Sequence, residues 1–162
     1  MTAALAIDRD GPAPHLAGVK SIHATCVALG GVGILLRGPS GSGKSDLALR
    51  LIDQGARLVA DDRVVLREDG GELRAEAPPR LRGLLEVRGV GPITVPSVLS
   101  VAVRLIVDLA PSGEVERLPD AAFDILEGKP IARHLLSAFE ASAPAKIRLL
   151  ARLTADVPAV EI

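Results

Sequence analysis

Aromatic residues are almost absent from this sequence of 162 residues. It has no Trp and no Tyr, and its two phenylalanines are Phe123 and Phe139. Proteins that bind single-stranded nucleic acid stack bases on aromatic side chains and surround the backbone with positive charge. The formal net charge here is −1, so no nucleic-acid partner is expected. A bound purine ring would have to be held by aliphatic side chains or by backbone.

Cysteine and long apolar runs are also scarce. The single cysteine, Cys26, has no partner for an internal disulfide and is expected to be a small buried hydrophobe. No Cys/His cluster has the spacing of a zinc site. Residues 1–14 have no basic start and no apolar stretch long enough for export or for a membrane span. We therefore expect a cytoplasmic protein with no structural metal and no membrane partner.

What the sequence does contain is a phosphate-binding motif. The pattern G-x-x-x-x-G-K-[ST] of a P-loop is formed by Gly38, Pro39, Ser40, Gly41, Ser42, Gly43, Lys44 and Ser45. An apolar strand is predicted before the motif at 32–36, and an amphipathic helix after it at 44–54, with Gly55 ending the helix. These flanking elements favour a true P-loop over a Gly/Ser-rich turn that matches by accident.

The residue types of the motif fit a nucleoside triphosphate, ATP, as ligand. Glycines allow successive backbone N–H groups to face a polyphosphate, and the helix N-terminus adds partial positive charge behind them. Lys44 can reach the β- and γ-phosphates, and the Ser45 hydroxyl is placed to bind the Mg²⁺ ion that bridges them.

A candidate histidine lies in the hairpin predicted before the P-loop. Alternation over 22–29 predicts a strand, and a Gly-Gly turn at 30–31 leads into the strand at 32–36. The register of such a turn places His23 opposite Gly38, at the mouth of the P-loop. A histidine there could carry a proton or stabilise phosphoryl charge. The alternative is a histidine on the solvent side of an edge strand.

An acidic pair follows the next predicted strand. The apolar run Leu58–Ala60 ends in Asp61 and Asp62. Carboxylates at the end of a strand beside a P-loop can hold Mg²⁺, directly or through water, or take a proton from an attacking hydroxyl. Strand alternation would point the two side chains to opposite sides, so they could divide these tasks. The alternative is an acidic turn without chemistry.

The middle of the chain predicts further strands. Segments 64–67 and 72–77 are expected to form a hairpin, and 101–109 alternates as a strand. The segment 84–93 is interpreted as a bulged strand with Glu86 and Arg88 on one face. From their residue types alone, these two could be a simple exposed ion pair.

The C-terminal part predicts helices. Segment 123–139 mixes apolar and charged residues with a helical period, and a terminal helix is expected over 142–154. Lys146, Arg148 and Arg152 give that helix a basic side, which could be a solvated face.

Four segments in this order resemble the catalytic domain of HPr kinase/phosphorylase. They are Ile22-His23-Ala24, Gly38–Ser45, Leu58–Arg63 and Leu85–Gly91. Members of this family are bacterial enzymes that phosphorylate a seryl residue of the phosphocarrier protein HPr in the sugar phosphotransferase system. The resemblance extends from about Ser21 to Leu109. It implies an α/β, P-loop-containing fold similar to phosphoenolpyruvate carboxykinase, with a mixed β-sheet and flanking helices.

The resemblance implies an ATP-dependent protein serine kinase that regulates carbon metabolism. Asp62 would be the base that takes the seryl proton, Asp61 would assist it, and His23 would also be catalytic. Run backwards, the same site would let phosphate attack the phosphoserine and release pyrophosphate, with the base now acting as an acid.

The resemblance also implies the groups that bind ATP and Mg²⁺. Lys44 would act on the phosphates, and Arg88, on the signature strand of the family, would stabilise phosphoryl charge. Glu86 would join Ser45 as a ligand of Mg²⁺. Relatives form hexamers, so a homo-oligomer is expected.

The sequence departs from the family pattern at several points. Pro39 and Asp46 replace an acidic residue and a Glu of the family P-loop. The C-terminal Gly-Arg-Asn segment of many relatives is absent, and 139–146 occupies its place, with Lys146 as the cation that could substitute for its arginine. The expected organisation is a flexible leader, 1–18, followed by one kinase domain, 19–156.

The short form, without the N-terminal domain of full-length relatives, is similar to that of α-proteobacteria. Two other functions fit the same motifs: a small-molecule kinase on this fold, and an ATP-binding regulatory module without chemistry. The acidic pair together with Glu86 argues against the second, because a binding module needs no three well-placed carboxylates.

Overall fold

The computed structural model describes residues 19–155 of the chain. The strands are β1 (Val19–Ile22), β2 (Thr25–Leu29), β3 (Val32–Arg37), β4 (Arg57–Ala60), β5 (Val64–Asp69), β6 (Glu72–Glu76), β7 (Leu84–Val87), β8 (Gly91–Thr94), β9 (Val101–Leu109), β10 (Ala122–Leu126) and β11 (Lys129–Leu136). The helices are α2 (Lys44–Asp53) and α3 (Ala143–Ala155). The expected leader, 1–18, lies outside the described residues.

The hairpin that leads into the P-loop has the predicted register. β2 pairs antiparallel with β3, with Leu29 opposite Val32 and Thr25 opposite Leu36, and the Gly-Gly turn at 30–31 has positive φ at both residues. Glycine takes such angles without strain because it has no Cβ, so this dipeptide is well suited to the turn. The register therefore brings the start of β2 to the level where β3 enters the P-loop.

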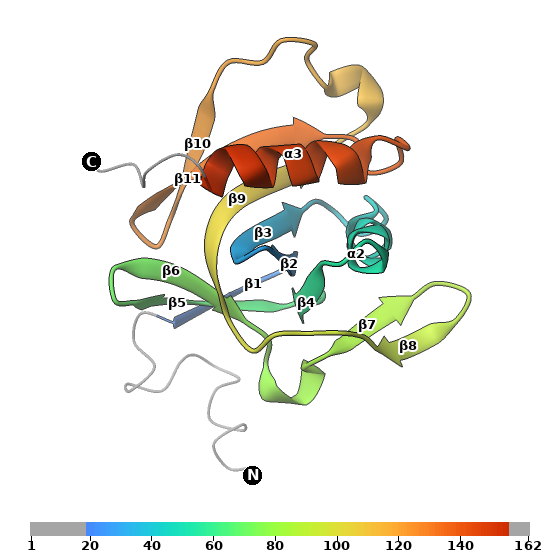
Figure 1. Cartoon of the computed structure of the whole chain (residues 1–162), viewed down its shortest axis with the longest axis vertical. Coiled ribbons are helices and arrows are strands. Elements are labelled where there is room, and N and C mark those ends of the chain that lie inside the picture. Colours follow the sequence, from blue (N-terminus) through green and yellow to red (C-terminus); the bar gives the residue numbers. More distant parts are fainter. Residues whose placement is uncertain (1–18, 156–162) are drawn as a thin grey trace.

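The long strand β9 joins two halves of a curved, mixed sheet. Its first residues pair antiparallel with β6, and the rest pairs parallel with β3 on one side and with β11 on the other. From β6 the sheet continues through β5 to β1, and from β3 through β2 to β4. Figure 1 shows β9 bending strongly between these halves. The expected α/β class with a mixed sheet is confirmed.

The helices cover one face of the sheet. α2 contacts β2, β4 and α3, and α3 lies across β3 and β9 (Figure 1). Because β3 is central, both of its faces are buried: Ile34 and Leu36 pack toward the helices with Leu47 and Ile147, whereas Leu35 packs into a second cluster. The P-loop thus connects the most buried strand to a helix fixed on the sheet.

α2 ends as the sequence predicts. Gly55 has a φ of 107°, its N–H donates to Ile52 O, and the N–H of Ala56 donates to Leu51 O. This pair of bonds is a Schellman motif, in which a left-handed residue closes the helix. The helix therefore has a fixed length between the P-loop and β4.

Two segments that were each predicted as one strand are divided into two strands in the structure, so these predictions are wrong. The alternating run 22–29 is broken at His23 and Ala24, because β1 pairs with β5 while β2 pairs with β3 and β4. The segment 84–93 is a separate hairpin of β7 and β8, with Val87 opposite Gly91, so it reverses direction where a bulge was expected.

The helical period predicted for 123–139 is also wrong. This segment forms the antiparallel hairpin β10–β11, in which Leu126 pairs with Lys129. The turn residues Glu127 and Gly128 both have positive φ, at 46° and 79°. Two consecutive residues of this kind match the twist of a tight hairpin, and they outweigh a weak helical pattern. The terminal helix α3 is confirmed.

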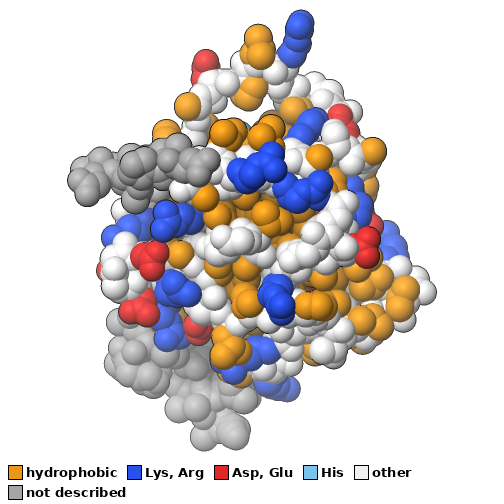
Figure 2. Space-filling view, in the orientation of Figure 1, with side chains coloured by type: hydrophobic (Ala, Val, Ile, Leu, Met, Phe, Trp, Pro, Cys, Tyr) orange, Lys and Arg blue, Asp and Glu red, His pale blue; other side chains and the backbone are white. Residues whose placement is uncertain are grey.

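The surface over α3 is mixed in character. Figure 2 shows Lys and Arg side chains over this helix with hydrophobic side chains exposed beside them. Leu149 and Leu153 belong to the exposed hydrophobic residues of α3. Among residues 19–155, no helix is both long and apolar enough to cross a membrane.

Candidate active site

The P-loop wraps around the side chain of its own lysine. Lys44 is 7% exposed, and its Nζ donates hydrogen bonds to Gly38 O at 2.5 Å and to Pro39 O at 3.1 Å. Gly41 and Gly43 have φ of 84° and 97°, which turn the loop around this ammonium group. A buried ammonium held on two carbonyls at the N-terminus of a helix makes the loop strongly attractive to a phosphate group.

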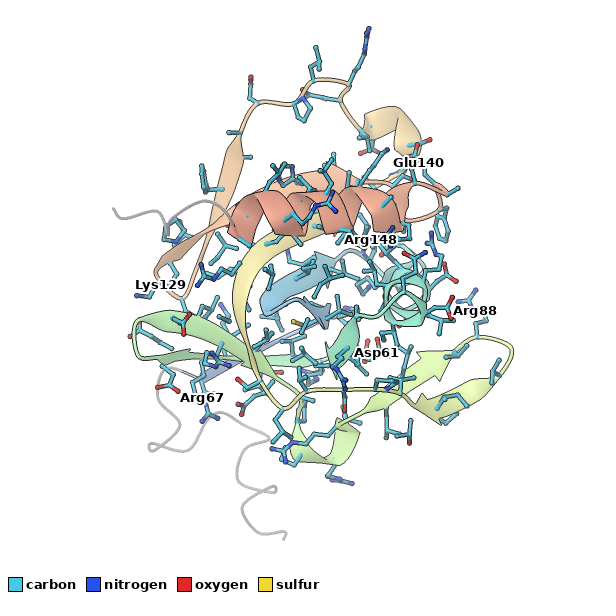
Figure 3. All side chains as sticks on the ribbon, in the orientation of Figure 1. Asp61, Arg67, Arg88, Lys129, Glu140 and Arg148 are labelled. Atoms are coloured by element: carbon cyan, nitrogen blue, oxygen red, sulfur yellow. The ribbon has the colours of Figure 1, made fainter. Side chains whose placement is uncertain are left out.

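Asp61 connects the P-loop helix to three other elements. Its Oδ1 accepts hydrogen bonds from Thr25 Oγ1 at 3.0 Å and from Ser45 Oγ at 2.8 Å, and its Oδ2 accepts one from Glu86 N at 3.2 Å. The residue is 7% exposed. Figure 3 shows it between α2 and the β7–β8 hairpin. A buried carboxylate satisfied by three donors holds these elements in register.

Asp62 points the other way, into the open. Its side chain is 74% exposed, and its Oδ1 lies 2.7 Å from Nε2 of His23, whose side chain is 48% exposed. The cause is a tight three-residue turn, because Arg63 N donates to Asp61 O at 2.7 Å and Asp62 has a φ of 67°. Such a turn is rare and strained in non-glycine residues. The side chains of Asp61 and Asp62 point in different directions because of this turn. Strand alternation had been the expected cause.

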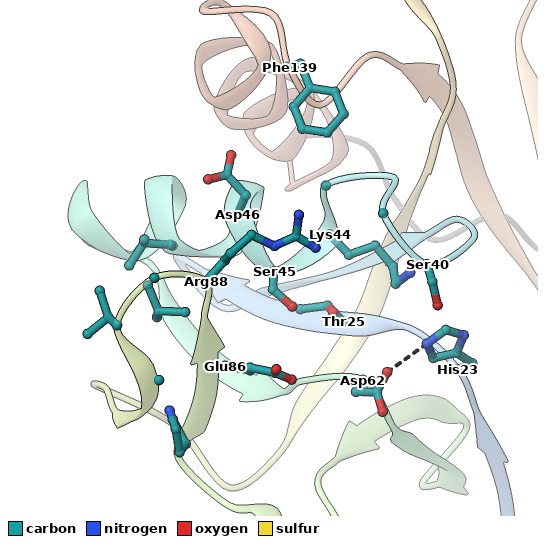
Figure 4. Close-up of a pocket in the computed structure, with 18 residues that line it drawn as sticks. His23, Thr25, Ser40, Lys44, Ser45, Asp46, Asp62, Glu86, Arg88 and Phe139 are labelled. Carbon is teal, nitrogen blue, oxygen red and sulfur yellow. Dashed lines mark hydrogen bonds and ion pairs between the residues drawn. The ribbon is translucent and has the colours of Figure 1, made fainter.

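The β7–β8 hairpin supplies Glu86 and Arg88. Glu86 lies on β7 and faces the P-loop (Figure 4). Arg88 lies in the turn between β7 and β8, so its expected position on a strand is wrong. Its side chain nevertheless points toward the P-loop in Figure 4. Arg88 therefore lines the cavity from the turn that follows Val87, the last residue of β7.

These groups line one cavity of about 1000 Å³. Its lining includes the predicted residues His23, Ser40, Gly41, Gly43, Lys44, Ser45, Asp62, Glu86 and Arg88. Gly38, Pro39, Ser42 and Asp61 are not part of the lining. Three of them hold lining side chains: the carbonyls of Gly38 and Pro39 accept from Lys44 Nζ, and Asp61 accepts from Ser45 Oγ. The volume is that of a site for a large organic ligand. The structure therefore brings most of the predicted catalytic and binding residues to a single cavity.

Thr25 and Phe139 are two of the lining residues that the sequence analysis did not name as site residues. Thr25 is fully buried and bonds Asp61, and the hairpin register already placed it beside the end of β3, opposite Leu36. Phe139 lines the far end of the cavity and is 69% exposed. The sequence could have drawn attention to Phe139 because aromatic residues are rare in it: the chain has only one other, Phe123.

Lys146, the cation proposed to replace a family arginine, lies outside the cavity lining. Its Nζ donates to Glu140 Oε1 at 3.0 Å. Lys146 N also donates to Ser142 O at 2.9 Å in the first turn of α3. This side chain is therefore engaged with the loop that precedes α3.

An ion-pair network fixes the strand end before the P-loop. Arg37, directly before Gly38, donates from Nε and Nη2 to Asp108 at 2.7 and 2.9 Å, and from Nη1 to Asp124 at 2.8 Å. Arg133 Nε also donates to Asp108, at 2.5 Å. Burial alone would raise the pKa of Asp108, but these arginines lower it below its usual value. The bidentate pair keeps β3 and β9 aligned where the P-loop begins.

A family model of the HPr serine kinase C-terminal domain matches residues 14–110. The chain belongs to this family. The HPr kinase/phosphorylase of Lactiplantibacillus plantarum is 44% identical over 114 residues, which are 68% of this chain and 36% of that protein. The corresponding protein of Exiguobacterium is 48% identical over 82 residues, 50% of this chain and 26% of that protein. The chain thus spans about a quarter to a third of the curated relatives it matches.

The fold is shared with a solved member of the family. The structure of the Hpr(Ser) kinase/phosphatase from Coxiella burnetii matches with a TM-score of 0.75 and 27% sequence identity, over 83% of this chain and 89% of that chain. The expected P-loop fold related to phosphoenolpyruvate carboxykinase is confirmed by this match. The family match also ends at residue 110, close to where the resemblance in the sequence fades.

Proposed function

We propose that this domain is an ATP-dependent protein serine kinase that acts on an HPr-type phosphocarrier protein. The observation that carries the proposal is the exposed His23–Asp62 pair, which shares a cavity with the P-loop. A carboxylate at the open side of a phosphate site can reach a hydroxyl presented by another protein. The names of the family members in the comparisons support HPr as that protein.

In the proposed reaction, Asp62 accepts the proton of the seryl hydroxyl while the seryl oxygen attacks the γ-phosphorus of ATP. A P–O bond forms to the serine, the bond from the γ-phosphorus to the β,γ-bridging oxygen breaks, and ADP leaves. His23 stabilises the Asp62 carboxylate across their 2.7 Å contact. Lys44 and Arg88 face the phosphates and stabilise the charge that develops on them.

The donor set beside the P-loop fits Mg²⁺, a hard cation that takes oxygen ligands. The Ser45 hydroxyl donates a hydrogen bond to Asp61 Oδ1. The lone pairs of the Ser45 oxygen are therefore free to bind the ion. Ser45 and the Glu86 carboxylate would hold the ion, which neutralises charge on the β- and γ-phosphates when bound. In this proposal Asp61 orients the Ser45 hydroxyl. The resemblance had instead implied that Asp61 assists Asp62, the base.

The reverse reaction uses the same groups. Phosphate attacks the phosphorus of phosphoserine, a P–O–P bond forms, the bond to the seryl oxygen breaks, and that oxygen takes its proton from Asp62. The products are serine and pyrophosphate. We propose this phosphorylase reaction as the second activity of the site.

We also propose that the domain works in the cytoplasm as a homo-oligomer, with a hexamer expected from the family resemblance. Exposed apolar side chains support association: Phe123 and Ile125 on β10 are 52% and 56% exposed. Such side chains in a cluster are typical of protein interfaces. Light scattering of the purified protein checks the mass of the assembly.

Transfer of label from γ-labelled ATP to the HPr-type protein of the source organism tests the proposal. We expect acid-stable label on a serine, and its loss by on the order of 10²-fold or more in Lys44→Ala. An Arg152→Ala variant, changed at an exposed cation of α3, serves as control and should transfer normally. Bound ATP without label on the protein would refute the kinase function and favour a small-molecule acceptor or a regulatory module.

A further inference from the structure

The cavity extends past the P-loop on the side away from the catalytic pair. In Figure 4 the His23–Asp62 pair lies on one side of Lys44 and Ser45, and Phe139 lies on the other side. All of these side chains line the same cavity. The cavity therefore has room for a nucleotide whose γ-phosphate faces Asp62 and whose base lies at the end where Phe139 is.

The backbone that carries Phe139 is held in place by Arg50. This arginine of α2 donates from Nη2 to Ala138 O and from Nη1 to Glu140 O at 3.3 Å, the carbonyls on either side of Phe139. Arg50 is itself paired with Asp46, Nη2 to Oδ2, at 3.0 Å. The ring thus projects from a fixed position, although it is 69% exposed.

The ring also rests against the P-loop. A Cβ atom built on Gly43 would lie 2.8 Å from Ala138 Cβ and 3.0 Å from Phe139 Cζ. A side chain at position 43 would therefore displace the ring. It would also be strained by the φ of 97° at this position. The edge of the ring lies against the loop, while most of the residue is exposed and it lines the cavity.

We propose that Phe139 is the stacking platform for the base of the nucleotide, and that Arg50 is the residue that positions it. An aromatic ring fixed at its edge and exposed over its surface matches a planar base, and stacking of this kind does not distinguish strongly between bases. The substrate class is then a nucleoside triphosphate. The proposal rests on the proposed function, because it takes the triphosphate to be bound at the P-loop. It replaces the expectation that only aliphatic groups or backbone could hold the base.

Comparison of ATP with inorganic tripolyphosphate separates stacking from phosphate binding. We would measure dissociation constants for both, each with Mg²⁺, by calorimetry on the full chain. Phe139→Ala should weaken ATP binding roughly tenfold and leave tripolyphosphate binding unchanged. Phe139→Trp should retain the affinity for ATP. The matched control is Phe123→Ala. It removes the other phenylalanine of the chain, which is exposed on β10, and should change neither affinity.

Arg50→Gln tests the positioning role with the same pair of ligands. It should weaken ATP binding and spare tripolyphosphate, whereas a general loss of structure would weaken both. Unchanged ATP affinity in Phe139→Ala, or an equal loss for both ligands, would overturn the stacking proposal. A wild-type chain that binds neither ligand would overturn the P-loop assignment and the stacking proposal together. ATP binding that depends on Phe139, without transfer to the HPr-type protein, would support stacking while contradicting the kinase function.

Discussion

His23 Nε2 lies 2.7 Å from Asp62 Oδ1, although the two residues are 39 positions apart in the chain. The contact joins the break between β1 and β2 to the tight turn after β4. Each side chain is too exposed for the contact to be explained as a buried structural bond. A strained backbone turn at an exposed carboxylate costs roughly 1–3 kcal/mol and persists where the surrounding structure enforces it. This pair is therefore the first target for mutation.

Asp62→Asn should abolish phosphoryl transfer while ATP still binds. The amide keeps the size of the side chain and a hydrogen bond with His23, but it cannot accept the seryl proton. We expect transfer to fall by about 10²-fold or more, measured with γ-labelled ATP, and the dissociation constant for ATP to stay within about twofold. Normal transfer by this variant would mean that the base is another residue.

Thr25→Val should lower the stability of the domain. The variant removes a donor from the buried carboxylate of Asp61 and puts a methyl group in its place. The lost hydrogen bond to a charged group predicts a decrease of about 2 kcal/mol in the free energy of unfolding, measured by urea denaturation. Thr25→Ser restores the hydroxyl and is the matched control. Equal stability of Thr25→Val and wild type would contradict the role given to this bond.

Asp108→Asn should remove part of the acid sensitivity of the fold. The pKa of Asp108 is lowered in the folded state, so its stabilising contribution is present above the unfolded-state value of 3.8 and is lost as the pH falls below it. We expect the wild type to lose stability more steeply than the variant below about pH 4. At neutral pH the variant should be less stable by about 2 kcal/mol. Asp120→Asn, at an exposed aspartate, is the control, and parallel pH profiles for Asp108→Asn and wild type would refute the assignment.

Cys26 should be inert toward alkylating reagents in the native protein. Burial raises the pKa of its thiol to about 12, although a backbone hydrogen bond at Ile34 partly opposes this, so almost no thiolate exists at neutral pH. Labelling with iodoacetamide should follow global unfolding in urea and be negligible before it. Rapid labelling of the native chain, detected by mass spectrometry, would show that this part of the sheet opens locally.

Local patterns predicted the P-loop side of the site well. The hairpin register from the Gly-Gly turn, the end of α2 at Gly55 and the strand before Asp61 are all set by short-range chemistry, and the structure confirms them. What the sequence could not provide was long-range pairing. The departure of β1 toward β5 breaks the strand at His23, and no local pattern marks that break.

The wrong assignments of elements near the site also come from contacts between distant parts of the chain. Arg88 and Phe139 reach the cavity from a turn and from a loop after β11, and such placements depend on distant packing. The β10–β11 hairpin was missed because Glu127 is not a typical residue for positive φ, so the turn signal was weaker than the helical period. Sequence reasoning thus selected side chains that share one cavity, but it assigned several of the elements that carry them wrongly.

The pairing of β3 with β9 has a consequence for the order in which the domain assembles during translation. β3 follows β2 across a two-residue turn, but Arg37 at the end of β3 and Asp108 on β9 are 71 positions apart. Closing a chain segment of this length costs roughly 4 kcal/mol of entropy. Until the ribosome has released β9, the strand that carries the P-loop has a neighbour on one edge only. We therefore expect a nascent chain to complete the sheet around its P-loop late, after most of the domain has been synthesised.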